Sequence, residues 1–351
     1  MKKILVASSA LVAVGFAGAA EASEPISLSV GGYMEQWAGI ADSDDGDEAK
    51  NAFQSDSEVY FRGKTTLDNG IEIGAVIELE AETSADQIDE QYIFVNGGFG
   101  RFEIGKNDSA ADAMGVTAPS VGPVGVNDGD MTAWTDSVSL IDTVPSSGDQ
   151  NRVTYYTPSF SGFRAGFSYA DQSKTNGSFD ANLNDDGDAI GGYHSDSAGD
   201  GMNIVSAGLE YSGDFDGFSL GLSAEGEHQG EGAWYGFGAN VGFGAFTVGA
   251  SYGHTEDDYG VSEDAAANDG DVDAFDVGVS YAMDAAAVSL TYAYQDDEDS
   301  NVETQAIDLG LAYTLGAGVA WKTSLFWGED DVQGDEDTDA YGVVTGLRLD
   351  F

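Results

Sequence analysis

Histidine is the first residue type to consider for chemistry, because imidazole can accept a proton or bind a metal near neutral pH. The 351-residue chain has three histidines, His194, His228 and His254, all in or beside expected loops. A hydrolase needs a nucleophile beside a base and a third group that orients the base. No serine or carboxylate pattern of that kind surrounds these histidines. We therefore expect no enzymatic activity.

Several acidic segments could bind calcium. The segment Asn182–Gly187 fits the first six positions of an EF-hand loop, but Tyr193 occupies the position that needs a bidentate glutamate. In the segment that starts with Asp42 and Asp44, the glycine comes one position too early. Solvated acidic loops are the simpler interpretation, with loosely bound Ca²⁺ as the alternative. Because the chain has no cysteine, disulfides and thiolate metal sites are excluded, and we expect no cofactor.

The chain is strongly acidic, with 63 Asp and Glu residues against 12 Lys and Arg and a formal net charge of -51. Binding to nucleic acid depends on Lys and Arg contacts with phosphate, so this charge excludes a sequence-independent nucleic-acid partner. It also argues against a surface that docks on anionic lipid.

The segment Met1–Ala22 has the features of a secretory signal peptide. Lys2 and Lys3 precede the apolar run Ile4–Ala20, and Ala20-Glu21-Ala22 places small residues where a signal peptidase reads them. We expect cleavage after Ala22, with an N-terminal membrane anchor as the alternative. No other long apolar stretch follows, so we expect no membrane-spanning helix in the mature chain.

The stretch Asn151–Tyr169 shows how the chemically interesting residues are positioned. A period of two indicates a strand with unlike faces, and the turn formers of Pro158–Gly162 indicate an antiparallel hairpin. One face is apolar and rich in aromatics: Val153, Tyr155, Phe163, Ala165, Phe167 and Tyr169. The other face combines arginine with mostly small or polar residues: Arg152, Thr154, Tyr156, Arg164, Gly166 and Ser168.

The same alternation recurs along the chain and predicts about sixteen strands. Besides the two strands of that hairpin, the expected strands are Ile26–Ile40, Asp56–Leu67, Gly70–Glu82, Ile88–Asn96, Arg101–Lys106, Met202–Ser212, Gly217–His228, Gly232–Phe243, Ala245–Thr255, Asp271–Met283, Ala285–Asp296, Val302–Leu315, Gly318–Gly328 and Asp339–Phe351. Most are about 9–13 residues long, which suits tilted strands that cross a bilayer.

The connections alternate between short turns and longer acidic loops. Short turns at one rim and long loops at the other are typical of an outer-membrane barrel, as is an even strand number. A soluble β-sandwich is the alternative, but its core would have to bury faces of Gly, Ser, Thr, Asp and Arg with unpaired polar groups. A closed barrel pairs every strand and lets those faces meet water. We therefore predict an all-β fold, a sixteen-stranded antiparallel transmembrane barrel spanning residues 23–351.

The mature chain resembles the general diffusion porins of Gram-negative outer membranes, most closely the alphaproteobacterial type. The resemblance rests on Ser57–Gly63 (SEVYFRG), Gly97–Gly105 (GGFGRFEIG), the hairpin Asn151–Tyr169 and the terminal strand, in this order after a signal peptide. It implies that Phe351 at the carboxyl end is read by the outer-membrane assembly machinery. It also implies that three barrels form a homotrimer, in contact with outer-membrane lipid and lipopolysaccharide.

The family's third long loop folds inward and narrows the lumen, and residues 107–150 lie in the matching place. The resemblance implies that the loop's Asp112, Asp128, Asp130 and Asp136 face a basic wall, with solvent exposure on the outer face as the alternative for each. Alternation places five cations on the lumen face of their strands, because Arg and Lys are costly toward lipid. These candidates for the basic wall are Arg62, Lys64, Arg101, Arg152 and Arg164.

The predicted function is therefore a water-filled outer-membrane channel for passive diffusion of small hydrophilic solutes and ions. The acidic composition gives the lumen a negative potential, so we expect a preference for cations. A substrate-selective uptake channel with a solute-binding track is the alternative, and a closed barrel plugged by loops is a third.

Overall fold

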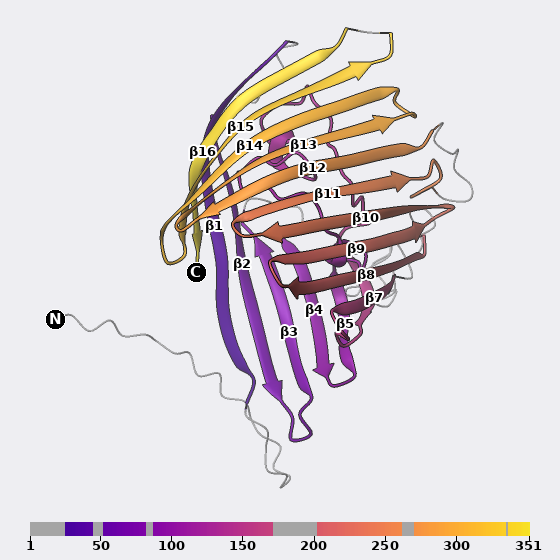
Figure 1. Ribbon diagram of the computed structural model, residues 1–351. Helices are drawn as coiled ribbons and strands as arrows, with labels where there is room; N and C mark the ends of the chain where they lie inside the picture. Colours follow the sequence, from indigo (N-terminus) through magenta and orange to yellow (C-terminus); the bar gives the residue numbers. More distant parts are fainter. Residues whose placement is uncertain (1–24, 45–51, 82–86, 171–201, 262–269, 335) are drawn as a thin grey trace, which may run out of the picture.

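The computed structural model describes residues 25–44, 52–81, 87–170, 202–261, 270–334 and 336–351, which form a closed barrel of sixteen antiparallel strands (Figure 1). Each strand pairs with its sequence neighbours, and the first strand pairs with the last. At this seam, Gly32 and Phe351 exchange two backbone hydrogen bonds of 2.9 and 3.0 Å. Closure removes the unpaired edge that an open sheet would expose to lipid.

The first seven strands are β1 (Ser27–Ser43), β2 (Phe53–Thr66), β3 (Glu72–Glu80), β4 (Ile88–Gly97), β5 (Gly100–Asn107), β6 (Gln150–Tyr156) and β7 (Phe163–Ala170). The remaining nine are β8 (Ile204–Phe215), β9 (Phe218–Gln229), β10 (Gly232–Phe243), β11 (Phe246–Thr255), β12 (Val272–Met283), β13 (Ala286–Asp297), β14 (Val302–Gly316), β15 (Val319–Val332) and β16 (Thr338–Asp350).

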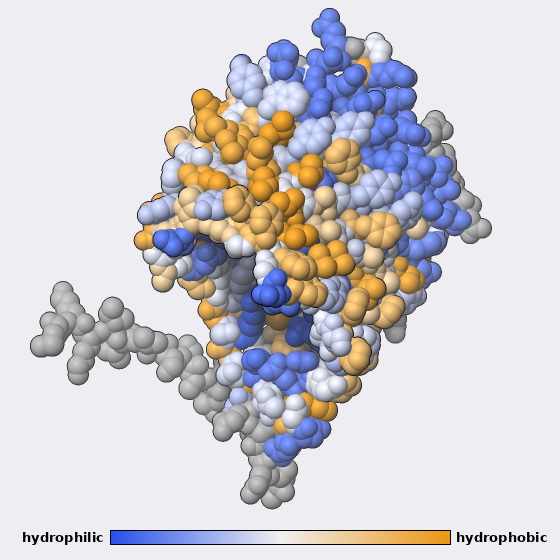
Figure 2. Space-filling view, viewed as in Figure 1, coloured by the Kyte–Doolittle hydropathy of each residue, from blue (hydrophilic) through white to orange (hydrophobic). Residues whose placement is uncertain are grey.

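Alternation separates an exposed apolar face from a covered polar face on each strand. In the β6–β7 hairpin, Val153 and Phe167 are exposed, whereas Thr154 and Ser168 on the opposite face are buried. The apolar side chains form a band on the outside of the barrel, which Figure 2 shows between a hydrophilic cap and a hollow that exposes hydrophilic residues. The outward face therefore suits lipid, and the polar face points into the barrel.

Short turns join the strands at one rim, and most connections at the other rim are longer, although only Gly230 and Glu231 join β9 to β10 there. The β2–β3 turn has Gly70 at a φ of +81°, a left-handed conformation that favours glycine, and the Ile71 amide donates to the Asn69 side chain. Stacked aromatic pairs mark the outer surface at the short-turn rim, such as Phe215–Phe218 and Phe243–Phe246. Aromatic rings at this depth are typical of a membrane interface.

The predicted fold class, strand number and closure are confirmed, and strand ends differ from the predicted ones by at most four residues. The largest difference is at β15, predicted to end at Gly328 and found to end at Val332. There, Glu329 and Asp330 still pair with Gln305 and Thr304 of β14. The side chains of Gln305 and Thr304 also donate hydrogen bonds to these two carboxylates, so the strand continues among acidic residues. In the described part of the chain, no helix has the length and apolarity needed to cross a membrane. The predicted signal peptide and the Asn182–Gly187 motif lie outside the described residues.

Candidate pore and its lining

The long connection between β5 and β6 crosses the inside of the barrel. It contains two short 3₁₀ turns, η1 (Asp112–Met114) and η2 (Asp130–Ala133). Its backbone N–H groups donate to buried inward side chains on β7, β8, β9, β12, β13 and β15. We call these five serines and one aspartate the hydroxyl belt. The bonds are Ala110 to Ser168 (3.2 Å), Ala111 to Ser206 (3.3 Å), Val116 to Ser223 (3.0 Å), Ala118 to Asp276 (3.0 Å), Val121 to Ser289 (3.0 Å) and Val124 to Ser324 (3.2 Å).

Inward glycines leave the space that the β5–β6 connection occupies. A Cβ atom on Gly238 of β10 would overlap the backbone carbonyl of Val116, and one on Gly253 of β11 would overlap the backbone of Thr143. The connection thus lies against main chain at these points. A side chain at either position would displace it.

An apolar cluster fixes the middle of the connection. Trp134 and Val124 are buried against β1 and β12–β16, where Phe326 and Val344 face inward. A Cβ atom on Gly39 of β1 would overlap the Trp134 ring, so this glycine makes room for the indole. The barrel therefore contains a small hydrophobic core between the connection and one side of its wall.

A buried ion pair anchors the end of the connection. The side chains of Arg152 on β6 and Glu227 on β9 are fully buried, 3.7 Å apart. Glu227 also accepts hydrogen bonds from the Ser147 amide and the Tyr259 hydroxyl, both at 2.8 Å. Arg152 in turn donates to the Gly148 carbonyl. Two buried opposite charges with these extra partners hold the connection close to the wall.

Carboxylates gather near both ends of the connection. Glu90, Asp108 and Asp149 each place an oxygen within 4.8 Å of the others, an arrangement that could hold a metal ion. Burial, reinforced by the charge of Asp108, raises the pKa of Asp112 and of Asp149 well above the usual aspartate range. Crowded carboxylates share protons when no cation neutralises them.

Each of the five predicted wall cations pairs with a glutamate on a strand. The pairs are Arg62–Glu78 (2.9 Å), Lys64–Glu72 (2.8 Å), Arg101–Glu103 (2.5 Å), Arg152–Glu227 (3.7 Å) and Arg164–Glu210 (2.8 Å). Arg62, Lys64 and Arg101 line one cavity at the short-turn half of β2–β5, whereas Arg152 lies under the connection and Arg164 lies on β7. The structure therefore brings three of the five together.

The four predicted loop aspartates do not share one environment. Asp128, Asp130 and Asp136 are exposed, and Asp112 is half-buried, with its amide bonded to the Ser109 hydroxyl at 3.2 Å. Asp128 also has a positive φ of 45°, which aspartate tolerates better than most residues.

Arginines on the inward face stack on aromatic rings, a feature that the sequence-based analysis missed. The guanidinium-to-ring distances are 4.3 Å for Arg348 over Tyr33, 4.5 Å for Arg62 over Tyr60, 4.1 Å for Arg101 over Phe94 and 5.1 Å for Arg164 over Tyr156. Arg348, which also pairs with Glu35 at 2.6 Å, alternates with Leu347 and Leu349, so its inward direction could have been read from the sequence. Stacking holds each guanidinium flat against the wall.

The sequence is similar to known porins. A family model described as Gram-negative porin matches residues 7–333. A curated porin of Rhodobacter capsulatus is 30% identical over 122 residues, which cover 34% of this chain and 38% of that relative. The aligned part of the chain thus spans less than half of that protein's length.

Solved structures agree with the fold. The anion-selective porin from Comamonas acidovorans superposes with a TM-score of 0.62 at 16% identity, covering 93% of this chain and all of that one. The trimer form of OmpT from Vibrio cholerae superposes with a TM-score of 0.59 at 12% identity, covering 92% of this chain and 99% of that one. At these identities the likeness concerns the barrel architecture.

Proposed function

The chain belongs to the Gram-negative porin family of outer-membrane proteins, which are not enzymes, and we propose that it forms a water-filled channel for passive diffusion of small hydrophilic solutes and ions. One observation carries this proposal: the β5–β6 connection lies mainly against β7–β16 and leaves inward side chains in the short-turn half of β2 open to solvent. The side chains of Arg62 and Lys64 on that strand are 56% and 61% exposed. Hydrated charges inside a closed barrel indicate water there.

The β5–β6 connection, predicted as residues 107–150 and found between Asn107 and Gln150, is proposed to be the constriction of this channel. Its hydrogen bonds to the hydroxyl belt and its buried core attach it to one side of the wall. It also reaches β1, where Trp134 lies against Gly39, and the long-loop end of β2, where Gln54 donates to the Ala133 carbonyl. The remaining passage then lies between the connection and the short-turn half of β2–β5. A rigid narrowing of this kind limits the size of solutes that diffuse through.

A preference for cations is proposed from the distribution of charge. The five predicted wall cations are each paired with a glutamate, while Asp128, Asp130 and Asp136 on the connection are exposed. With a net charge of -51 for the chain, the lumen and its mouth have a negative potential.

Single-channel recording in a planar bilayer tests the channel and its cation preference. In a KCl gradient we expect steady conductance steps and a reversal potential with the sign of K⁺ selectivity. A reversal potential that favours chloride would contradict the cation preference while leaving the channel intact. Protein that inserts without conductance would identify a plugged barrel.

A homotrimer is proposed, with β1–β4 as the contact surface. On the outward face of this region, Gln36 of β1 lies beside Met34 and opposite Ser55 of β2, and both polar residues are exposed on the single barrel. Polar side chains at the depth of an apolar band are costly in lipid but can hydrogen-bond across a protein contact. The solved trimer form of the Vibrio cholerae neighbour shows that this architecture can form trimers.

We propose that the chain is exported with a cleaved signal peptide and assembled through its terminal strand. Cleavage after Ala22 would give a mature protein that starts at Ser23, and N-terminal sequencing of protein purified from outer membranes tests this directly. Phe351 is 66% exposed beside the barrel seam, where the assembly machinery could read its ring. The outward apolar band would contact outer-membrane lipid, with lipopolysaccharide at the long-loop rim.

A further inference from the structure

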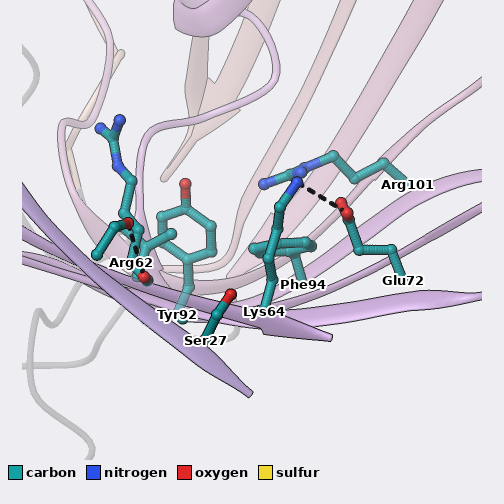
Figure 3. A pocket seen from close by; sticks show the side chains of 10 residues that line it. Ser27, Arg62, Lys64, Glu72, Tyr92, Phe94 and Arg101 are labelled. Carbon is teal, nitrogen blue, oxygen red and sulfur yellow. Dashed lines mark hydrogen bonds and ion pairs between the residues drawn. The ribbon is translucent and has the colours of Figure 1, made fainter. Parts of the chain in front are cut away.

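A cavity of about 400 Å³ opens on the inward face of β1–β5, near the short turns (Figure 3). Figure 3 shows the Tyr92 ring between Arg62 on one side and Lys64 with Arg101 on the other. Ser27 of β1 and Glu72 of β3 also line it. The hydroxyl-belt contacts of the β5–β6 connection lie on β7–β15, so this cavity is a separate part of the lumen.

The cations of this cavity are held but remain accessible. Glu72 pairs with Lys64 at 2.8 Å, and Glu78 pairs with Arg62 at 2.9 Å. The Arg62 and Lys64 side chains are nevertheless more than half exposed, and that of Arg101 is 31% exposed. Three cations and one carboxylate therefore line the cavity, and the cations already have a fixed geometry.

The floor of the cavity is apolar. Val76 and Phe94 are 4% and 6% exposed, covered by the stems of the charged side chains. A Cβ atom on Gly74 would overlap the Phe94 ring, so this glycine lets the ring lie flat. Arg101 stacks on that ring at 4.1 Å. The second face of a stacked guanidinium can accept another planar group.

We propose that this cavity binds a small organic monoanion, a carboxylate attached to a flat apolar body, as it passes through the channel. The carboxylate accepts hydrogen bonds from Lys64 and Arg62, and the flat body lies beside Tyr92 and Arg101. This proposal rests on the proposed channel function and names one class of solute for it. Each of the three cations is paired with a glutamate, Glu72, Glu78 or Glu103, so the site has little excess positive charge, which favours a monoanion over phosphate.

Block of single-channel current by benzoate tests the proposal, with acetate and inorganic phosphate as comparison anions. Acetate has the same carboxylate and charge but no ring. We expect brief interruptions of the current by benzoate, and much weaker effects of acetate and phosphate at equal concentration. Equal block by all three anions would contradict a site for a flat organic body.

Benzoate block of the variants Lys64→Gln and Arg101→Gln tests whether the site is this cavity. The variant Lys322→Gln is the matched control. Lys322 lies on β15, two positions from the hydroxyl-belt residue Ser324, so it faces inward outside this cavity. We expect the two cavity variants to raise the half-blocking benzoate concentration about fivefold, as for one exposed charge contact, and Lys322→Gln to leave it unchanged. Equal effects of all three variants would show a general charge effect and overturn the site. Missing conductance steps in the unmodified protein would instead refute the channel.

Discussion

Arginines with the same predicted role have different environments in this barrel. Arg152 and Arg164 lie on neighbouring strands and both face inward. Arg152 is fully buried against Glu227, whereas Arg164 and Glu210 keep 37% and 31% of their side chains exposed. Burial makes the first pair much more sensitive to loss of one partner, because the remaining charge then has no water to solvate it.

Glu227→Gln is therefore expected to destabilise the protein strongly. The substitution preserves volume but leaves the Arg152 charge buried without its counter-charge, at a cost on the order of 3 kcal/mol. The matched control Glu210→Gln removes an exposed partner, for which we expect less than about 1 kcal/mol. Urea unfolding of the refolded protein in detergent measures both. Equal losses in the two variants would show that burial of Arg152 does not determine the effect.

The stability of the folded protein is expected to depend on pH through Asp142. Burial is the main reason that the pKa of Asp142 rises to about 6; the nearby Asp128 charge adds to it, and the Val144 amide, which donates at 2.7 Å, opposes it. Because the pKa is higher in the folded than in the unfolded protein, the folded state takes up a proton more readily. This proton uptake by Asp142 adds to the free energy of unfolding. The contribution is fully present below about pH 4 and is lost as the pH rises through 6.

Asp142→Asn should remove this part of the pH dependence. Unfolding free energies measured between pH 4 and pH 8 are expected to fall with increasing pH in the unmodified protein and to fall less in the variant. The raised pKa values of Asp112 and Asp149 act in the same direction, so some dependence will remain. An identical pH profile for the variant would show that Asp142 does not contribute.

At the scale of elements, the β5–β6 connection behaves as an extra layer packed on the wall. Its backbone N–H groups donate to serine hydroxyls and to the Asp276 carboxylate. Its backbone carbonyls lie over inward glycines of the wall. Each belt bond to a serine contributes about 0.5–1.5 kcal/mol. The close approach at glycine is the more sensitive feature, because main chain cannot rotate away as a side chain can.

Gly238→Ala tests that close approach. The new Cβ atom would overlap the Val116 carbonyl, and we expect a loss of about 1–3 kcal/mol in stability together with an altered, noisier conductance. Gly221→Ala on neighbouring β9 is the control, since a Cβ atom there meets open space. Both glycines face inward, so a difference between them reports contact with the connection. Steady, unchanged conductance of Gly238→Ala would mean that the connection does not limit the pore.

At the scale of the whole molecule, the proposed trimer contact can be separated from general membrane insertion. Gln36→Trp adds a large ring to the outward face of β1 where a second copy would pack, so we expect monomers in detergent, seen by size-exclusion chromatography with light scattering. Val277→Trp adds the same ring to the exposed outward face of β12 and should leave the trimer intact. A trimer that persists in Gln36→Trp and dissociates in Val277→Trp would place the contact on the other side.

Local patterns were sufficient for much of this architecture. Alternation in Asn151–Tyr169 predicted which side chains face outward, and the structure confirms it: Phe163 and Phe167 are exposed, and Arg152 and Thr154 are buried. Turn residues such as Asp68-Asn69-Gly70 predicted which strands pair. Strand alternation and turn chemistry act over a few residues, so they can be read without knowing the rest of the chain.

The sequence by itself determined the number of strands, their two faces and the place of the long β5–β6 connection. Only the tertiary structure decided what each inward polar residue meets. Val124 bonds to Ser324, 200 positions further along the chain, and the small polar residues expected to line water instead hold the connection. Alternation states only that a side chain points inward. Whether that side chain contacts water, a carboxylate or another segment depends on which strands the closure of the barrel brings together.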